Sequence, residues 1–592
     1  MNEASGSEER GISPHGLLLV AGGVVVVVQA VVLTLAFQVV PHTGGDNAAY
    51  LTLAHSLLER GAYLELWEPG DPPHAKYPPV FPALLAAVMG LGAATWTAFK
   101  GVSALFVSLA VILAFAWAGA RRGALFALAV ALLLVLSDAF LDASHWVLSE
   151  PPFLALTLAA LWAADRVGTL RGIGEWWGER EGEPGLRSPE GPGSDPYLPG
   201  WIALVGATAV LAYFTRSAGL PLVAAVALWL GLARRWRTLA AFGAAFALPA
   251  LLWVLRARGV GEEDYIAEFW LVDPYQRELG TVGPLDLGAR VLENLRIYVL
   301  DAFPVGVVGP MEGWAPLLGV ALVGLAAVGW GRRLWSGPGL AELFAPIYLG
   351  LILLWPEVWS GDRFALPLYP LLLFYAGESV VDGARRLGSG WPPLAGAAAF
   401  LALALPALGS LADRVDRSQA CREVAEEMGP YACQPAGAQQ FNRAAAWSGT
   451  HLPDDAVVYS RKPRIFHLLS GLSSRMYPQT RDPAELLEDA DATGVGYVVL
   501  DQVDAMSMRY LGPAVESRLS AFCHLEAWQE PPGPRTFMLG IRPPVEDGEG
   551  ASGPREGEGP GEGLEPCAAD RVRADPAEPP ELTSPVIPIV QP

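Results

Sequence analysis

The segment GGDNAAYLTLAHSLLERGAYLELWEPGDPPHAKYPPVFP (residues 44–82) follows the first long apolar block of the chain. Its first half has apolar residues at the i, i+3, i+4, i+7 and i+8 positions of an amphipathic helix. These positions are Tyr50, Leu53, Ala54, Leu57 and Leu58. We expect this helix to end at Gly61 and to lie in the membrane interface. The segment therefore predicts an ordered surface loop between membrane-spanning helices.

The rest of the chain is dominated by uninterrupted apolar blocks, and 52% of its 592 residues are hydrophobic. Such blocks predict an α-helical polytopic membrane protein with about eleven transmembrane helices. The blocks are 16–40, 98–119, 123–138, 151–166, 200–216, 217–233, 238–256, 313–330, 340–357, 364–380 and 391–411. The first has about 25 residues, or about 37 Å of helix, which is long enough for a retained membrane anchor.

Arginines in short turns indicate which side of the membrane each loop occupies. They stand at 121–122, 234–237, 332–333 and 385–386, and the positive-inside rule makes these turns cytoplasmic. Eleven spans then give a cytoplasmic N-terminal tail (1–15) and a cytoplasmic insert (167–199) in a plasma (inner) membrane protein. The outer face receives 41–97, 137–150, 257–312 and everything after 411. The formal charge of −21 argues against nucleic acid as a partner.

The membrane domain is expected to span 16–411, with 41–97 as its first outer loop. Residues 412–545 have the pattern of a small extracytoplasmic α/β domain, in a β-α-α-β order followed by a hairpin through Cys523 and Phe537. The tail 546–592 is rich in Gly, Glu and Pro and is expected to be disordered. The cysteines show no zinc-ligand spacing, and both a disulfide and free thiols are compatible with Cys421 and Cys433.

Two charged residues of the first outer loop have a structural and a functional interpretation. Asp46 is either the N-cap of the amphipathic helix or a catalytic carboxylate beside Gly44 and Gly45, which clear the backbone around it. Lys76 either extends to lipid headgroups or supplies a point charge for a phosphate. The prolines after Lys76 favour an extended backbone, followed by an apolar helix of about ten residues that is too short to span the membrane.

Three further charged residues stand at the expected outer boundary. Glu150 is either a helix-start acid or a second-site carboxylate, and Arg216 and Arg363 are cations on the side opposite to the positive-inside trend. Either an ion pair, within Asp362–Arg363 or between helices, or an anionic ligand must compensate these arginines. The acidic and aromatic loop 257–312 suits sugar binding, although aromatic belts have the same composition.

The order of these motifs resembles the GT-C superfamily, and more closely bacterial glycosyltransferase family 39, which includes dolichyl-phosphate-mannose protein mannosyltransferases and aminoarabinose transferases. The resemblance covers residues 14–410 and rests on the first-loop acid, "YPPVFP", "SEPPFLAL", the arginine before Ala-Gly-Leu and "DRFALPLYP". The outer C-terminal domain is similar to those of such bacterial enzymes. Asn47 stands where many relatives have a second acid, and His74 where aminoarabinose transferases have a glutamate.

The resemblance implies a hexosyl- or pentosyltransferase that uses a polyprenyl-phosphate-linked sugar, without a metal or other cofactor, in contact with membrane lipids. The acceptor would be a lipid, a glycan or a protein. By position Asp46 matches the catalytic acid, and Lys76 with Tyr77, Glu150, Arg216 and Arg363 are the substrate-binding candidates. One carboxylate to accept a proton and cations to stabilise a departing phosphate are sufficient for an inverting displacement.

Other classes of protein remain compatible with parts of this pattern. A transporter or flippase would place polar sites near the middle of the membrane on broken helices, whereas the notable charges here lie at the outer edge. A non-catalytic membrane assembly protein would share the fold without activity. A metal-dependent oligosaccharide transferase would need clustered carboxylates, and the DxD at Asp489 and Asp491 is on an expected helix of the C-terminal domain.

Overall fold

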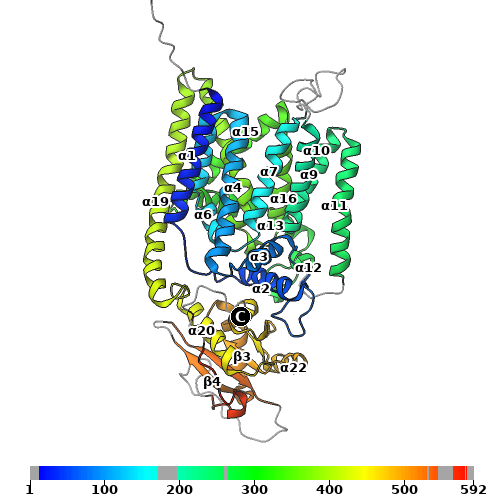
Figure 1. Ribbon diagram of the computed structural model, residues 1–592, viewed down its shortest axis with the longest axis vertical. Coiled ribbons are helices and arrows are strands. Elements are labelled where there is room, and N and C mark those ends of the chain that lie inside the picture. The colour runs from blue at the N-terminus through cyan, green and yellow to red at the C-terminus, as the bar shows by residue number, and fades with distance from the viewer. Residues whose placement is uncertain are drawn as a thin grey trace, which may run out of the picture.

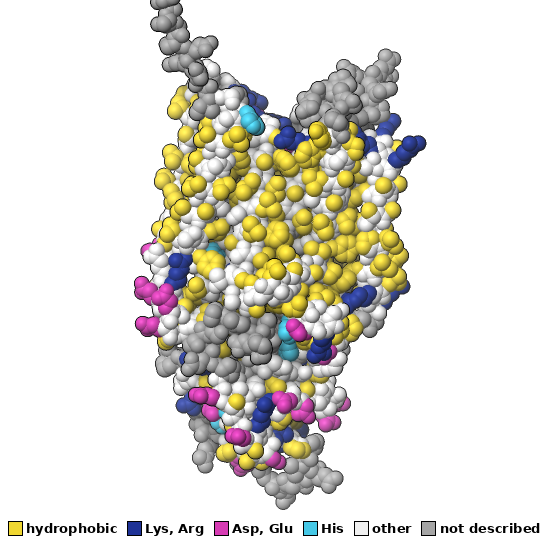
Figure 2. Space-filling model, in the orientation of Figure 1, with side chains coloured by type: hydrophobic (Ala, Val, Ile, Leu, Met, Phe, Trp, Pro, Cys, Tyr) yellow, Lys and Arg dark blue, Asp and Glu magenta, His cyan; other side chains and the backbone are white. Residues whose placement is uncertain are grey.

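A computed structural model describes residues 13–170, 197–258, 265–311, 313–529, 533–543, 564–579 and 582. The chain forms a helical bundle with a mixed α/β domain beneath one end (Figure 1). Apolar side chains cover the flank of the bundle seen in Figure 2, and charged side chains gather toward its two ends and on the lower domain. This distribution is that of a helical polytopic membrane protein.

Each of the eleven apolar blocks contains one main helix of the bundle. These helices are α1 (Pro14–Leu35), α4 (Trp96–Arg122), α5 (Ala124–Leu136), α7 (Glu150–Val167), α9 (Leu198–Thr215), α10 (Leu220–Leu232), α11 (Trp236–Ala257), α15 (Ala315–Ser336), α16 (Leu340–Leu354), α18 (Tyr369–Arg385) and α19 (Trp391–Met428). Shorter helices between them are α6 (Asp138–His145), α12 (Tyr265–Trp270), α13 (Pro284–Ile297), α14 (Phe303–Val308) and α17 (Asp362–Ala365). Single turns complete the connections at Ser217–Gly219, Arg277–Leu279, Tyr298–Ala302, Glu357–Trp359 and Leu366–Leu368.

The expected number of about eleven spans is higher than the number of helices with the length and composition of a span. Within the described ranges seven helices qualify, or up to eight if the bent pair α5 and α6 is one span. The difference has a local cause: α10 and α16 have only 13 and 15 residues, and α7 carries Glu150, Asp165 and Arg166. These three helices belong to the bundle, but length and apolar composition alone do not make them spans.

Arginines of two of the predicted cytoplasmic turns, 121–122 and 332–333, meet at the end of the bundle away from the α/β domain. Arg121 forms an ion pair with Glu342, and Arg122 and Arg333 both pair with Glu378. Their shared location agrees with the assignment of these turns to one side of the membrane. Which side is cytoplasmic remains a prediction.

Helices α2 (Gly45–Arg60) and α3 (Val80–Gly90) lie between the lower end of the bundle and the α/β domain (Figure 1). Both are present as the sequence predicts, but most of the polar side of α2 is closed to solvent, and Glu59 near its end is exposed. Asn47, Thr52 and Ser56 are buried together with the apolar side chains, and both α3 and α21 (Pro463–Ser470) pack on α2. Most of α2 therefore forms an internal layer between the bundle and the α/β domain, and its contact with the membrane interface stays a prediction.

The α/β domain contains a five-stranded sheet in the order β2-β1-β3-β5-β4. Strands β2, β1 and β3 are parallel, and β5 is antiparallel to both β3 and β4. The strands are β1 (Val457–Tyr459), β2 (Ser473–Arg475), β3 (Tyr497–Leu500), β4 (Phe522–Trp528) and β5 (Thr536–Ile541). The remaining helices are α20 (Ala436–His451), α22 (Pro483–Thr493) and α23 (Gly512–Ser517), with single turns at Ser507–Leu511, Leu519–Ala521 and Ala569–Arg571. The hairpin of β4 and β5 is as predicted, but the predicted β-α-α-β order lacked β2, a three-residue edge strand between α21 and α22.

One hydrophobic core is shared between the first outer loop and the α/β domain. Tyr50 of α2 and Phe81 of α3 belong to the same buried cluster as Phe441 of α20 and Phe466 of α21. Burial of each large aromatic side chain contributes about 1.5–3 kcal/mol, so separating the domain from the loop would expose apolar surface worth several kcal/mol. The α/β domain is therefore fixed to the bundle through α2 and α3.

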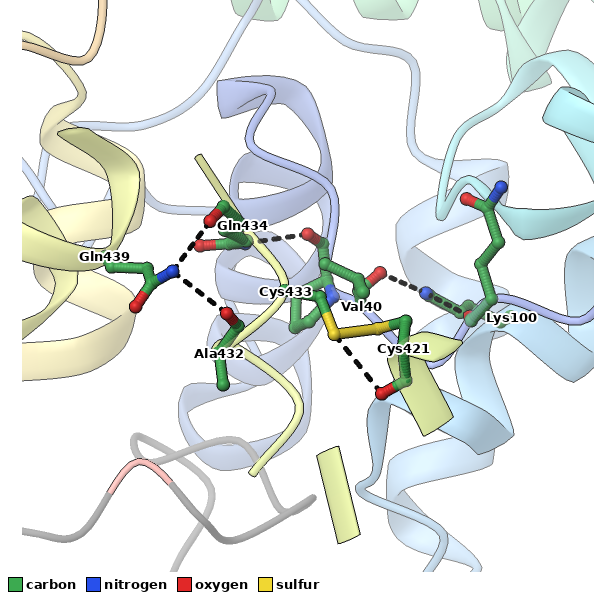
Figure 3. Close-up of a disulfide and its surroundings, with 9 residues drawn as sticks. Val40, Lys100, Cys421, Ala432, Cys433, Gln434 and Gln439 are labelled. Carbon is green, nitrogen blue, oxygen red and sulfur yellow. Dashed lines mark hydrogen bonds between the residues drawn. A yellow bond between two sulfur atoms is a disulfide. The ribbon is translucent and has the colours of Figure 1, made fainter. Parts of the chain in front are cut away.

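Disulfides connect the four cysteines in two pairs. The Cys421–Cys433 bond joins the end of α19 to the turn before α20, close to the first outer loop (Figure 3). The same view shows Lys100, whose ammonium donates to the backbone carbonyls of Gln38 and Val40 and so holds the chain that leaves α1. Of the two alternatives for these cysteines, the structure contains the disulfide.

The second disulfide, Cys523–Cys567, corrects the expectation that 546–592 is disordered throughout. Residues 564–579 are part of the domain, where Arg571 donates to the carbonyls of Gly496 and Ile541. Composition predicted disorder because it does not register a covalent link to β4. Most of this tail, like the N-terminal residues 1–12 and most of the polar insert, lies outside the described residues.

Candidate active site

A cavity of about 750 Å³ lies between the bundle and the α/β domain. Its walls come from α2, the proline-rich segment after it, the loop 257–312, the α9–α10 turn, the segment before α18 and the chain after β1. The charged lining residues are Asp46, Glu68, Lys76, Arg216, Glu268, Asp362, Arg363, Arg461, Lys462 and Arg464. Six cations face four carboxylates, so the lining carries net positive charge that suits an anionic ligand.

Asp46 lies in the first turn of α2 and does not cap the helix. The N-cap is Gly44, and no side chain caps this end. One carboxylate oxygen of Asp46 accepts a hydrogen bond from the Tyr77 hydroxyl at 2.8 Å, and the other accepts from Arg363 Nη2 at 2.9 Å. The side chain is 32% exposed to the cavity. The N-cap alternative is thus excluded, and the carboxylate is available to a ligand.

Close packing explains why one of the two residues before Asp46 is a glycine. A Cβ on Gly44 would lie 2.7 Å from Nδ1 of His42, whereas a Cβ on Gly45 would meet no atom within 4 Å. His42 Nδ1 accepts a hydrogen bond from the Gly44 amide at 2.9 Å, which requires this close approach. Gly44 therefore allows the chain to turn tightly into α2 and places Asp46 at the cavity.

Cations keep the Asp46 carboxylate ionised. Burial alone would raise its pKa, but the Arg363 guanidinium, then Arg464 and the hydrogen bond from Tyr77 hold that pKa well below its usual range. Arg464 approaches the same carboxylate from the α/β domain, with Nη1 at 3.8 Å from Oδ1. In the absence of a ligand Asp46 is therefore a carboxylate whose basicity is suppressed mainly by Arg363.

Glu150 and the two outer-boundary arginines form an ion-pair network between helices. Glu150 begins α7, and one of its carboxylate oxygens forms an ion pair with Arg216 Nη1 at 2.8 Å and accepts a hydrogen bond from Arg363 Nε. Asp362 is not the ionic partner of Arg363; its carboxylate accepts the backbone N–H of that residue instead. Glu150 is 3% exposed and does not line the cavity, so it acts behind the two arginines that do.

Lys76 and Tyr77 lie side by side on the cavity wall. Lys76 Nζ forms an ion pair with Glu268 of α12 at 2.8 Å and is 11% exposed, so it faces the protein rather than lipid headgroups. The Tyr77 amide donates to Nε2 of His74 at 2.8 Å, while Nδ1 of that histidine contacts Glu65. His74 therefore fixes the backbone that presents both residues to the cavity.

Sequence reasoning missed the contribution of the α/β domain to this site. Arg461, Lys462 and Arg464 follow β1 and line the cavity, and Arg464 Nη1 donates to the Tyr77 hydroxyl at 3.1 Å. Arg461 and Lys462 share the carboxylate of Asp504, at 2.8 and 3.5 Å. The available signal was the run SRKPR at 460–464, three cations within five residues of a predominantly acidic region.

The DxD of the C-terminal domain is engaged within that domain. Asp489 accepts a hydrogen bond from the hydroxyl of Tyr459, on the strand that α22 covers. Across the described ranges, no three His, Cys, Asp or Glu side chains are grouped in a way that could hold a metal ion.

The bundle, the ordered first outer loop and the small mixed α/β domain define a GT-C-like fold. ArnT from Cupriavidus metallidurans in the apo state has a TM-score of 0.51 and 14% identity over 89% of this chain and 98% of that chain. The Archaeoglobus fulgidus oligosaccharyltransferase in complex with Zn and sulfate gives 0.48 and 13%, covering 88% and 72%. The mycobacterial arabinofuranosyltransferase AftD gives 0.41 and 15%, covering 89% and 40%. At 14% identity the likeness to ArnT is one of fold.

Sequence comparisons give no closer relationship. No family model matches the chain, and no curated protein matches it.

Proposed function

We propose that this protein is an inverting glycosyltransferase related to family 39 that moves a sugar from a polyprenyl-phosphate donor to a lipid, glycan or protein acceptor on the outer face of the membrane. The observation that carries the proposal is the pairing of the Asp46 carboxylate with the Arg363 guanidinium, 2.9 Å apart, on the wall of a net-cationic cavity at one end of a membrane bundle. A base and a phosphate-binding cation are the two groups that this reaction requires.

In the proposed reaction an acceptor hydroxyl or amine attacks the anomeric carbon of the donor. The bond from that carbon to the phosphate oxygen breaks, and the carrier leaves as polyprenyl phosphate. Asp46 takes the proton of the nucleophile, while Arg363, Arg216 and Lys76 stabilise the negative charge that develops on the leaving phosphate. A single displacement with an oxocarbenium-like transition state inverts the anomeric centre.

Donor binding also activates the base. Without a ligand, Arg363 divides its hydrogen bonds between Asp46 and Glu150. A donor phosphate competes for the same guanidinium and weakens its hold on Asp46, which raises the pKa of the carboxyl toward its ordinary value. The base therefore becomes effective only when the leaving group is in place.

The position of the cavity suits a donor with a long prenyl tail. It opens between the end of the bundle and the α/β domain, so a tail can stay in hydrocarbon while its phosphate meets the cations. ArnT has also been solved bound to undecaprenyl phosphate, and the archaeal enzyme AglB with an inhibitory peptide and a dolichol-phosphate. Sugars linked to these two carriers are therefore the donors to test first.

The test compares the parent with Asp46→Asn in membranes supplied with radiolabelled undecaprenyl- and dolichyl-phosphate sugars. General base help is typically worth about 10²–10⁴ in rate, so Asp46→Asn should lose at least about 100-fold in product. Glu59→Gln is the matched control, because Glu59 is an exposed acid on the same helix. It should transfer at the parent rate.

Each alternative outcome has a separate meaning. Full activity of Asp46→Asn would refute Asp46 as the base. Movement of the lipid between leaflets by the parent, without a new glycosidic product from any donor, would favour the flippase instead. Absence of both transfer and lipid movement would favour an assembly protein.

A further inference from the structure

Arg464 is the point at which the α/β domain touches the proposed base. It is the second residue of α21, and its guanidinium donates to the Tyr77 hydroxyl at 3.1 Å and lies 3.8 Å from the Asp46 carboxylate. Tyr77 in turn donates to Asp46 at 2.8 Å. The three side chains form a chain of charge-assisted contacts that begins in one domain and ends at the base in the other.

The surroundings hold Arg464 in a fixed direction. Its guanidinium stacks over the rings of Trp67 and Tyr77, with distances of 5.3 and 5.6 Å to the ring centroids. The carbonyl of Trp67 accepts a hydrogen bond from the backbone N–H of Ser474 in β2 at 2.7 Å. Trp67 therefore contacts the α/β domain through both its backbone and its ring. Arg464 therefore reaches Asp46 only when the domain is seated on the first outer loop.

We propose that Arg464 is a positioning residue for the transfer reaction: it orients Tyr77 against Asp46, so that the base is assembled only when the α/β domain is docked. This inference rests on the proposed function and adds a second domain to its machinery. Arg363 remains the cation that a donor phosphate binds in competition with Asp46, whereas Arg464 keeps its place on Tyr77 during the reaction. Loss of Arg464 should therefore reduce turnover more than donor affinity.

The test is a double-mutant cycle in the full-length protein with the donor that the parent uses. Arg464→Gln should lower kcat about 10-fold or more and leave KM for the donor within about twofold. Tyr77→Phe should lower kcat by a similar factor, and the double variant should be hardly slower than the worse single variant, because both substitutions break the same contact. Arg464→Lys should recover part of the loss.

Arg481→Gln is the matched control, because Arg481 is an exposed arginine of the same domain that bonds a backbone carbonyl away from the cavity. It should behave as the parent. The inference would be overturned if the fold-loss in kcat of the double variant equalled the product of the two single losses. An equal loss in Arg481→Gln, or a rise in KM without a fall in kcat, would also overturn it.

A second readout does not depend on turnover. The same cycle is measured in the thermal unfolding of the detergent-solubilised protein, where Arg464→Gln and Tyr77→Phe should again be non-additive. Additive effects on unfolding would overturn the inference. A parent that shows this coupling but transfers no sugar from any donor would refute the proposed function and, with it, the positioning role that rests on it.

Discussion

Replacing Glu150 by glutamine tests whether the buried carboxylate behind the cavity holds the two arginines in place. Glutamine keeps the volume of the side chain but removes the charge that Arg216 and Arg363 share. Both guanidiniums would then lack the carboxylate that they share. Arg363 would keep its ion pair with Asp46. We expect a loss of both stability and activity.

The magnitude follows from the geometry. At charge separations of about 4 Å and an effective dielectric constant of about 20, each ion pair is worth about 4 kcal/mol in direct interaction. Rehydration of the freed arginines returns part of this, and breaking a buried pair typically costs about 3–5 kcal/mol. Because two pairs share one carboxylate, Glu150→Gln should lower the unfolding free energy by at least about 3 kcal/mol. Displacement of Arg363 should lower transfer at least about 10-fold.

Glu378→Gln provides a control with the same chemistry at the other end of the bundle. Glu378 is also 3% exposed and also binds two arginines, Arg122 and Arg333. Both variants should show a similar decrease in thermal stability in detergent, while only Glu150→Gln should lose transfer per folded molecule. Equal activity in the two variants, or a melting temperature of Glu150→Gln unchanged from the parent, would refute the reasoning.

Two further predictions concern the α/β domain. Burial raises the pKa of the Asp501 carboxyl to about 6, so the folded state binds its proton more tightly than the unfolded state and stability falls as the pH rises from about 4 to 6. Asp501→Asn should be about 3 kcal/mol more stable than the parent above pH 6 and equal to it below pH 4 in thermal unfolding; a constant difference across this range would contradict the assignment. Cys567→Ser opens a loop of sequence separation 44, and the chain-entropy model gives a loss of about 4 kcal/mol. Limited proteolysis should then cleave within 564–579, and equal protease resistance of parent and variant would exclude a stabilising role for the bond.

Local features of the chain were predictable from sequence because their causes are local. Every apolar block contains a helix, and the proline-rich turn and short helix α3 lie within the first outer loop as expected. The hairpin of β4 and β5 was predicted through Cys523 and Phe537, and both residues lie in its strands. The predicted number of spans was higher than the number of helices that qualify, because α7 carries charge and α10 is short. Apolar character alone does not separate a span from a buried helix.

Contacts between distant residues were only partly predictable. Hydropathy predicted that Asp46 and Arg363 lie at the same end of the bundle, but a direct contact across 317 positions depends on how the helices pack. Arg464 was missed because spacing does not show which edge of the α/β domain faces the bundle. The link from Cys523 to Cys567 was missed because a Gly- and Glu-rich composition outweighed the single cysteine in the tail.

The shared core of α2, α3, α20 and α21 has a consequence for protein engineering. A chimera that exchanges only the C-terminal region for that of a structurally similar enzyme would set foreign side chains against Tyr50 and Phe81, and the graft would meet a mismatched surface. The unit that can be transplanted intact therefore includes residues from both ends of the sequence. Attempts to alter acceptor choice by grafting should move α2, α3 and the α/β domain together.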